Sequence, residues 1–208
     1  MNKIFLIIFL CILAYGSIYM GRRMYTSTSG FVNNEKKVMN LYESALAEKN
    51  SGDLERAKAD LDQALEFAPE NKKINILLGD VYTAMNFEEN AVGFYERGLS
   101  SPEGVNSEDI PVMFTLSRQY VNNHNLKTRY GFKKCYSVAM ECYQKILGFE
   151  PQNTKAMLGL GICQSKLEDY QSAKETLDKL LKLNPDAKIA AMAQQILNEL
   201  NTLKNPTK

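Results

Sequence analysis

Residue types that carry catalytic or metal chemistry are scarce in this chain of 208 residues. His124 is the only histidine, which excludes a two-histidine metal site, and the four cysteines form no CxxC pair. The sequence contains no GxSxG, GxxxxGKS/T or GxGxxG motif. We therefore expect no catalytic residues, no metal and no cofactor, and we interpret the protein as a non-enzyme.

Two alternatives involving cysteine remain open. Activation of the Cys135 thiol by His124 would give a nucleophile, although nothing in the sequence requires the two residues to meet. A disulfide between Cys142 and Cys163 is also open, whereas Cys135 and Cys142 lie too far apart on one predicted helix to form a bridge. We favour buried, unpaired thiols that pack as small apolar side chains.

The charge balance argues against nucleic acid as a partner. The chain carries 25 basic and 24 acidic residues, but residues 1–37 hold five of the basic residues and one of the acidic residues. The remainder is therefore slightly acidic and has no general attraction for a polyanion. Apolar residues make up 45% of the chain, which is enough for a packed core.

The N-terminal residues are predicted to form a membrane anchor. No charged residue occurs within Ile4–Met20, and Arg22 and Arg23 follow. A helix of this length spans about 26 Å, at the short end of what crosses a bilayer. A cleaved signal peptide is the alternative, because a small-x-small pattern precedes Ser17. We expect a single-pass membrane protein with a slight preference for an extracytoplasmic body, an anchor over residues 1–23 and a polar tether over residues 24–37.

The rest of the chain repeats a pattern with a period close to 34 residues. Four alanines are separated by 34, 48 and 34 residues, and four prolines follow the same rhythm. Apolar residues spaced by three, four and seven positions around these marks predict amphipathic helices, and small residues allow two helices to approach closely. The marks are Ala57, Ala91, Ala139, Ala173, Pro69, Pro102, Pro151 and Pro185.

A bulky-then-small pair recurs in the helix that precedes these marks. It is Leu78-Gly79 in one unit, Leu116-Ser117 in the next and Leu160-Gly161 in the last. With the alanines, prolines and neighbouring tyrosines, this pattern resembles the tetratricopeptide repeat family, whose unit is a pair of antiparallel helices. The resemblance implies an all-α, helix-turn-helix superhelical solenoid of about four repeats plus a capping helix, preceded by the N-terminal transmembrane or signal helix.

The same resemblance divides the body of the chain. We assign repeats to residues 38–71, 72–105, 110–153 and 154–187, and a capping helix with a C-terminal tail to residues 188–208. The apolar stripe of the capping helix is predicted to be Ile189, Met192, Ile196 and Leu200. The third repeat is too long, which indicates an insertion over residues 122–134 between its two helices.

A groove lined by the first helix of each repeat is the partner-binding site that the resemblance implies. Most of its residues are apolar, and the Lys, Asn and Arg set with which some family members clamp a C-terminal carboxylate is missing except for Arg118. We therefore expect the groove to bind an apolar or helical segment of another protein. Its predicted residues are Tyr42, Leu46, Ile76, Asp80, Thr83, Phe114, Arg118, Leu158 and Ile162.

The insertion is a second candidate surface. No Asp or Glu occurs between Asp109 and Glu141. Basic and aromatic residues alternate there, and such a loop could contact anionic lipid, an acidic partner or RNA, or could simply be solvated. The basic residues are Lys127, Arg129, Lys133 and Lys134.

These observations favour a membrane-tethered adaptor or assembly factor that holds other proteins in its groove. The alternative is an exported soluble protein, released by signal cleavage, with a chaperone-like or envelope role. Nucleic acid is not expected as a partner.

Overall fold

The computed structural model describes residues 34–204, and the side chains up to residue 202. The predicted anchor and most of the predicted tether lie outside this range, although residues 34–37, which we assigned to the tether, are already helical. Among the described residues, no helix is both long and apolar enough to cross a membrane. The chain divides into two compact units, and the boundary between them in the sequence lies between Pro69 and Glu70.

The first unit is a pair of helices, one over residues 34–51 and the other α2 (Leu54–Phe67). Gly52, at a φ of +89°, and Asp53, whose side chain accepts a hydrogen bond from the Arg56 amide, make the turn between them. Lys37 lies over the Phe67 ring, 4.4 Å from its centroid, and so connects the two helices.

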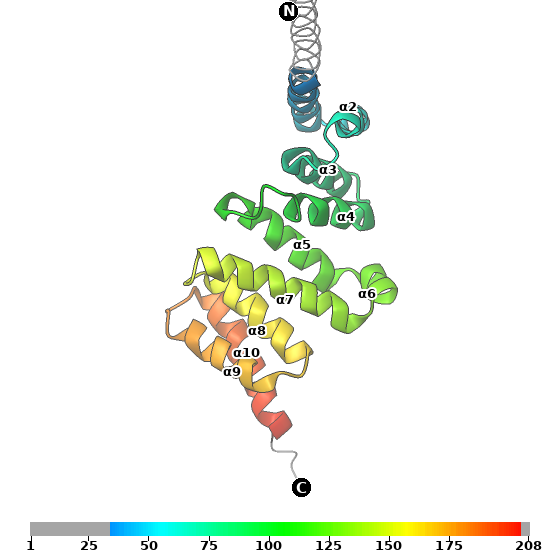
Figure 1. Cartoon of the computed structure of the whole chain (residues 1–208). Coiled ribbons are helices and arrows are strands. Elements are labelled where there is room, and N and C mark those ends of the chain that lie inside the picture. The colour runs from blue at the N-terminus through cyan, green and yellow to red at the C-terminus, as the bar shows by residue number, and fades with distance from the viewer. Residues whose placement is uncertain (1–33, 205–208) are drawn as a thin grey trace, which may run out of the picture. The chain divides into compact units, whose positions relative to one another are not determined.

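The second unit is a solenoid of α-helices, and its described residues contain no strand. The helices follow one another in chain order (Figure 1). α3 packs on α4, α5 packs on α7, and α8 packs on both α7 and α9, while α10 covers α8 and α9. The elements are α3 (Lys72–Ala84), α4 (Glu88–Leu99), the short 3-10 helix η1 (Ser107–Asp109), α5 (Ile110–Asn122), α6 (His124–Tyr130), α7 (Phe132–Phe149), α8 (Thr154–Lys166), α9 (Tyr170–Leu181) and α10 (Ala187–Lys204).

Most helices begin in the same way. The side chain of the residue before the helix accepts a hydrogen bond from the backbone amide three residues later, which satisfies one of the unpaired N–H groups at the helix start. Asn71, Asn123, Asn153 and Asp169 cap α3, α6, α8 and α9 in this manner. The sequence therefore marks most of the helix starts locally.

Small residues lie where paired helices cross, as the repeat pattern predicts. Ala57, Ala91, Ala139 and Ala173 are all fully buried. A Cβ atom added at Gly79 would lie 2.5 Å from the Tyr95 ring, and one added at Gly161 would lie 2.7 Å from Leu177. The prediction that these positions allow close packing of helices is confirmed.

The capping helix packs through a stripe that differs from the predicted one. Ile189 and Leu200 are buried in α10, but Ala193 and Leu197 complete the buried face, and Met192 is 41% exposed. The prediction for Met192 is wrong because the buried positions 189, 193, 197 and 200 follow one another by four, four and three residues, so position 192 lies to one side of the stripe.

The insertion is helical, which corrects our expectation of a loop. Residues 124–130 form α6, and α7 begins directly after Gly131, at Phe132. Leu126 is completely buried in the same core as Tyr120 and Cys135. One apolar side chain at the centre of a polar segment is therefore enough to fold the insertion onto α7.

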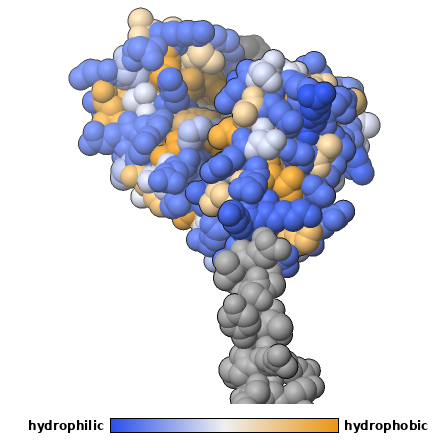
Figure 2. All heavy atoms as spheres, turned by 90° about the horizontal axis from the view of Figure 1, so that it is seen from above, coloured by the Kyte–Doolittle hydropathy of each residue, from blue (hydrophilic) through white to orange (hydrophobic). Residues whose placement is uncertain are grey.

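The surface is mixed in character. Figure 2 shows one face, on which hydrophilic residues predominate and hydrophobic residues form several patches. Such a surface is ordinary for a globular protein, so only large side chains that are strongly exposed are informative. Among the described residues these include Phe87, Tyr130, Phe132 and Phe149.

Candidate partner-binding site

The hydroxyl of Tyr95 is the centre of a polar cluster on α3, α4 and α5. It donates a hydrogen bond to Asp80 Oδ1 over 2.9 Å and lies 3.1 Å from Thr83 Oγ1. Because its one proton is directed to Asp80, Thr83 is the donor in the second bond. Gln119 Nε2 in turn donates to Thr83 Oγ1 over 3.1 Å. These bonds connect α3 with α5, the first helices of successive predicted repeats.

The Tyr95 hydroxyl remains protonated. Burial raises the pKa of Tyr95 and has the largest effect; the hydrogen bond with Thr83 acts in the other direction, the Asp80 carboxylate raises the pKa further, and the charge of Arg118 lowers it. The hydroxyl therefore stays a donor throughout the physiological pH range.

Gln119 has an unused acceptor in this cluster. Only 7% of the residue is exposed, and its Oε1 atom is buried with no hydrogen-bond partner among the described residues. Leaving such an atom without a partner costs about 1–3 kcal/mol. Because the atom is buried, another molecule could bond it only after the Gln119 side chain had moved.

A cation and an aromatic ring border the same cluster on α5. Arg118 is exposed and forms no ion pair within residues 34–204, and its charge lowers the pKa of both Tyr95 and Tyr143 against the larger effect of burial. Phe114 is half-buried, and its ring meets the ring of Tyr143 edge-on at 6.1 Å. Four of the predicted groove residues, Asp80, Thr83, Phe114 and Arg118, thus belong to one region of the second unit.

The remaining predicted groove residues are placed differently. Leu158 is buried in the core of α8 to α10 and has little surface left for a partner, and Ile162 packs partly against that core. Ile76 fills the contact between α3 and α4, where a Cβ atom added at Gly98 would lie 2.8 Å from Ile76 Cγ1. Tyr42, which is half-buried, and Leu46, which is 38% exposed, belong to the first unit.

The structure also changes the expected chemistry of the site. Tyr95 and Gln119 were not among the predicted residues, and with them the region is polar at its centre and aromatic at its edge. Tyr95 was visible in the sequence as the aromatic residue of a second helix. Its hydrogen bond to Asp80 could not be read from the sequence, because that bond depends on how two helices cross.

The predicted basic insertion is partly neutralised. Arg129 forms an ion pair with Glu89 at 2.9 Å, and Lys127 Nζ lies 5.4 Å from the centroid of the Tyr136 ring. Lys133 and Lys134 are exposed at the start of α7. The four basic residues therefore lie in the same segment, but their contacts differ.

The three cysteines that the structure describes are buried and are not activated as nucleophiles. Cys135 is buried, and burial raises the pKa of its thiol although the charge of Lys127 acts in the opposite direction. Burial also raises the pKa of Cys142 to about 11 and that of Cys163 to about 12. These three thiols are free, so the disulfide alternative is not adopted. Because a reactive cysteine needs a low pKa, a structural role fits all three.

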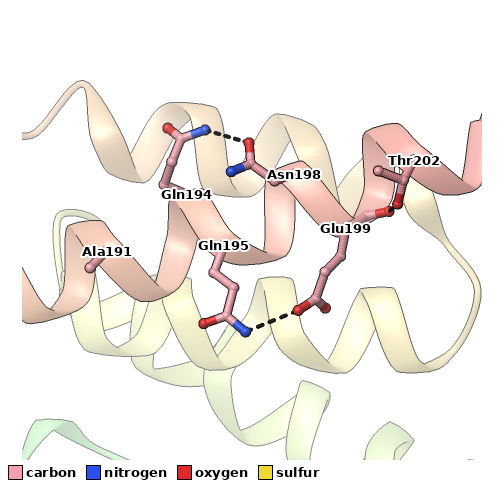
Figure 3. Close-up of a pocket in the computed structure, with 6 residues that line it drawn as sticks. All are labelled: Ala191, Gln194, Gln195, Asn198, Glu199 and Thr202. Carbon is pink, nitrogen blue, oxygen red and sulfur yellow. Dashed lines mark hydrogen bonds between the residues drawn. The ribbon is translucent and has the colours of Figure 1, made fainter.

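Two other depressions lie on the described residues, one of them between the start of α4 and α6. A shallow depression on the outer face of α10 is lined by residues of that helix alone, whose side chains bond one another along the helix (Figure 3). Gln194 donates to Asn198, and Gln195 donates to Glu199. Within the part of the chain that the structure describes, no group of three or more His, Cys, Asp or Glu residues is placed to hold a metal ion.

Comparisons with known proteins identify the repeat. Family models described as tetratricopeptide repeat match residues 40–71 and 122–196, which together make up just over half of the chain. Superkiller protein 3 of Schizosaccharomyces pombe is 30% identical over 129 residues. That match covers 59% of this chain but only 9% of the larger protein, so it bears on the repeats alone.

Solved structures agree on the fold. The structure of MamA protein has a TM-score of 0.60 at 14% identity, and the match covers 83% of this chain and 86% of that chain. A tetratricopeptide repeat protein from Parabacteroides merdae has a TM-score of 0.59 at 21% identity, over 80% of this chain and 60% of that one. At such identities the likeness extends to the helical solenoid and no further.

Proposed function

Because this chain is a tetratricopeptide repeat protein, we propose that it is an interaction scaffold that binds a segment of another protein on the shared face of α3 and α5. The observation that carries this proposal is the exposed Arg118, which forms no ion pair within residues 34–204 and lies one helical turn from the half-buried Phe114 ring on α5. The hydrogen bond from Gln119 to Thr83 joins this part of α5 to α3.

The region defines the chemistry of its partner. Arg118 provides a charge for a carboxylate, and the Phe114 ring can cover an apolar side chain. An amphipathic helical segment carries both kinds of group on one side. The partner is therefore mixed in character, whereas the sequence pattern favoured an apolar or helical segment.

Site-specific photo-crosslinking in cells tests this proposal. A photo-reactive residue replaces Thr115, which lies one helical turn from Arg118 and Gln119, and the matched control replaces Gln195 on the outer face of α10. We expect one discrete adduct from position 115 and none from position 195. The adduct should disappear in Arg118→Ala, and Phe114→Ala should weaken binding by roughly 1–3 kcal/mol, as buried aromatic anchors commonly do. Equal adducts at both positions would contradict the proposal.

We further propose that the N-terminal segment tethers this scaffold to a membrane, where it acts as an adaptor or assembly factor. The support is the uncharged run Ile4–Met20 followed by Arg22 and Arg23. The protein should then stay in the membrane fraction through a carbonate wash. A native chain that begins at Ser17 and washes off freely would favour the exported, chaperone-like or envelope alternative, and protease protection would show on which side the body lies.

A further inference from the structure

The turn between α6 and α7 exposes two aromatic rings. Gly131, at a φ of +85°, reverses the chain there, and the residues on either side of it, Tyr130 and Phe132, are 46% and 47% exposed. The Phe132 ring rests on Tyr136 with 4.6 Å between centroids, and the Tyr130 ring meets Tyr120 edge-on at 6.4 Å. The Arg129 guanidinium also lies over the Tyr130 ring, 5.6 Å from its centroid. Each ring is thus held by the protein and still exposes about half of its residue's surface to solvent.

Positive charge surrounds these rings. Lys133 and Lys134 follow Phe132 directly and are exposed, and Lys127 lies against the Tyr136 ring. Arg129 is neutralised by Glu89, so the lysines carry the net charge of this region. We name as the α6–α7 corner the set Lys127, Arg129, Tyr130, Phe132, Lys133 and Lys134.

We propose that the α6–α7 corner docks on the surface of an anionic lipid membrane. Tyrosine rings suit the headgroup level of a bilayer, and lysine side chains place their charge among anionic headgroups while their stems lie along apolar surface. The corner combines both features on one turn. The same chain carries the apolar run Ile4–Met20, and a chain held at a bilayer needs only weak contacts to dock a second site on it.

Tryptophan fluorescence can report this contact without interference from the N-terminal run, because the chain contains no tryptophan. The full-length Phe132→Trp variant is reconstituted into phosphatidylcholine vesicles with or without phosphatidylserine, each containing brominated phosphatidylcholine as a quencher. We expect a blue-shifted emission and strong quenching only in the vesicles that contain phosphatidylserine. High salt should reverse both effects.

The opposite end of the same helix is the matched control. Phe149 is 42% exposed, and it lies about 26 Å from Phe132 along α7 at the usual helical rise. Phe149→Trp should show no difference between the two lipid mixtures. Circular dichroism checks that each variant is folded.

Substitution of the lysines provides a second test of the proposal. Replacement of both Lys133 and Lys134 by Ser in the Phe132→Trp background should lower the docking equilibrium roughly 25-fold, since each lysine near an anionic surface contributes about five-fold. Identical Phe132→Trp emission in both lipid mixtures would overturn the proposal. So would a shift with soluble polyglutamate as large as that with lipid, which would indicate an acidic protein as the partner.

Discussion

At the scale of single residues, the second unit depends on a buried ion pair between the start of α3 and the segment before α5. Lys72 Nζ lies 2.5 Å from Asp109 Oδ2, and each side chain is 6% exposed. Lys72 Nζ also donates to the carbonyl of Gly104, and Asp109 accepts from the Asn106 amide. The pair therefore fixes the long connection between α4 and α5, where no helix contact could do so.

Removing one partner of this pair should be costly. Lys72→Met leaves the Asp109 carboxylate buried without its counter-charge, and we expect the free energy of unfolding to fall by roughly 3–5 kcal/mol. Arg129→Met is the matched control, because the Arg129–Glu89 pair is exposed and such pairs contribute about 0–1 kcal/mol. Urea denaturation measures both. Equal losses in the two variants would show that the burial of the first pair has no energetic consequence.

The buried thiols should make stability depend on pH. The pKa of Cys142 is raised from its ordinary value of 9.0 to about 11 in the folded protein. The unfolded thiol ionises first as the pH rises, so its contribution to stability is complete below pH 9 and is lost as the pH approaches 11. Between these limits the wild type should lose about 2 kcal/mol more than Cys142→Ala. Parallel curves of unfolding free energy against pH would contradict this prediction.

At the scale of helices, glycines identify where two elements touch. A Cβ atom added at Gly159 in α8 would lie 2.3 Å from the Tyr143 ring, whereas one added at Gly148 in α7 would meet nothing within 4 Å. The same substitution should therefore have opposite effects at the two positions, because overpacking and helix propensity act in opposite directions.

Gly159→Ala should lower the free energy of unfolding by roughly 1–3 kcal/mol, since the ring of α7 must move. Gly148→Ala should raise it by up to about 1 kcal/mol, because alanine is the better helix former. Thermal melts of the two variants decide the matter. A gain in stability for Gly159→Ala would mean that α7 and α8 do not meet as described.

The helices show which features can be read from sequence. Caps such as Asn71 and Asn153, and the alanines at the crossings, were predictable because they follow from spacing within one repeat. α6 was not predicted, because Leu126 is its only buried residue and its cap, Asn123, lies in a segment without an apolar repeat pattern. The polar cluster at Tyr95 was also missed, because it joins side chains from three helices whose crossing geometry no local spacing encodes.

At the scale of the whole molecule, a solenoid needs a closed end. The last predicted repeat, α8 and α9, would leave Leu177 and Leu180 without a cover, and α10 packs Ile189, Ala193 and Leu197 against this core. The outer face of α10 carries amides that bond along the helix. α10 thus covers the last predicted repeat with a helix that is apolar on one side and mostly polar on the other.

Deleting residues 187–208 should consequently loosen the stack from this end. In a repeat protein each unit is stabilised mainly by its neighbours, so the loss should be greatest in α8 and α9 and smallest in α3 and α4. Hydrogen exchange of backbone amides measures this gradient. A less drastic pair of variants serves as a control: Leu197→Ala, at a buried position, should cost about 2–5 kcal/mol, and Met192→Ala, at an exposed one, less than about 0.5 kcal/mol. Uniform loss of protection across all helices would indicate a single cooperative core instead of a stack of units.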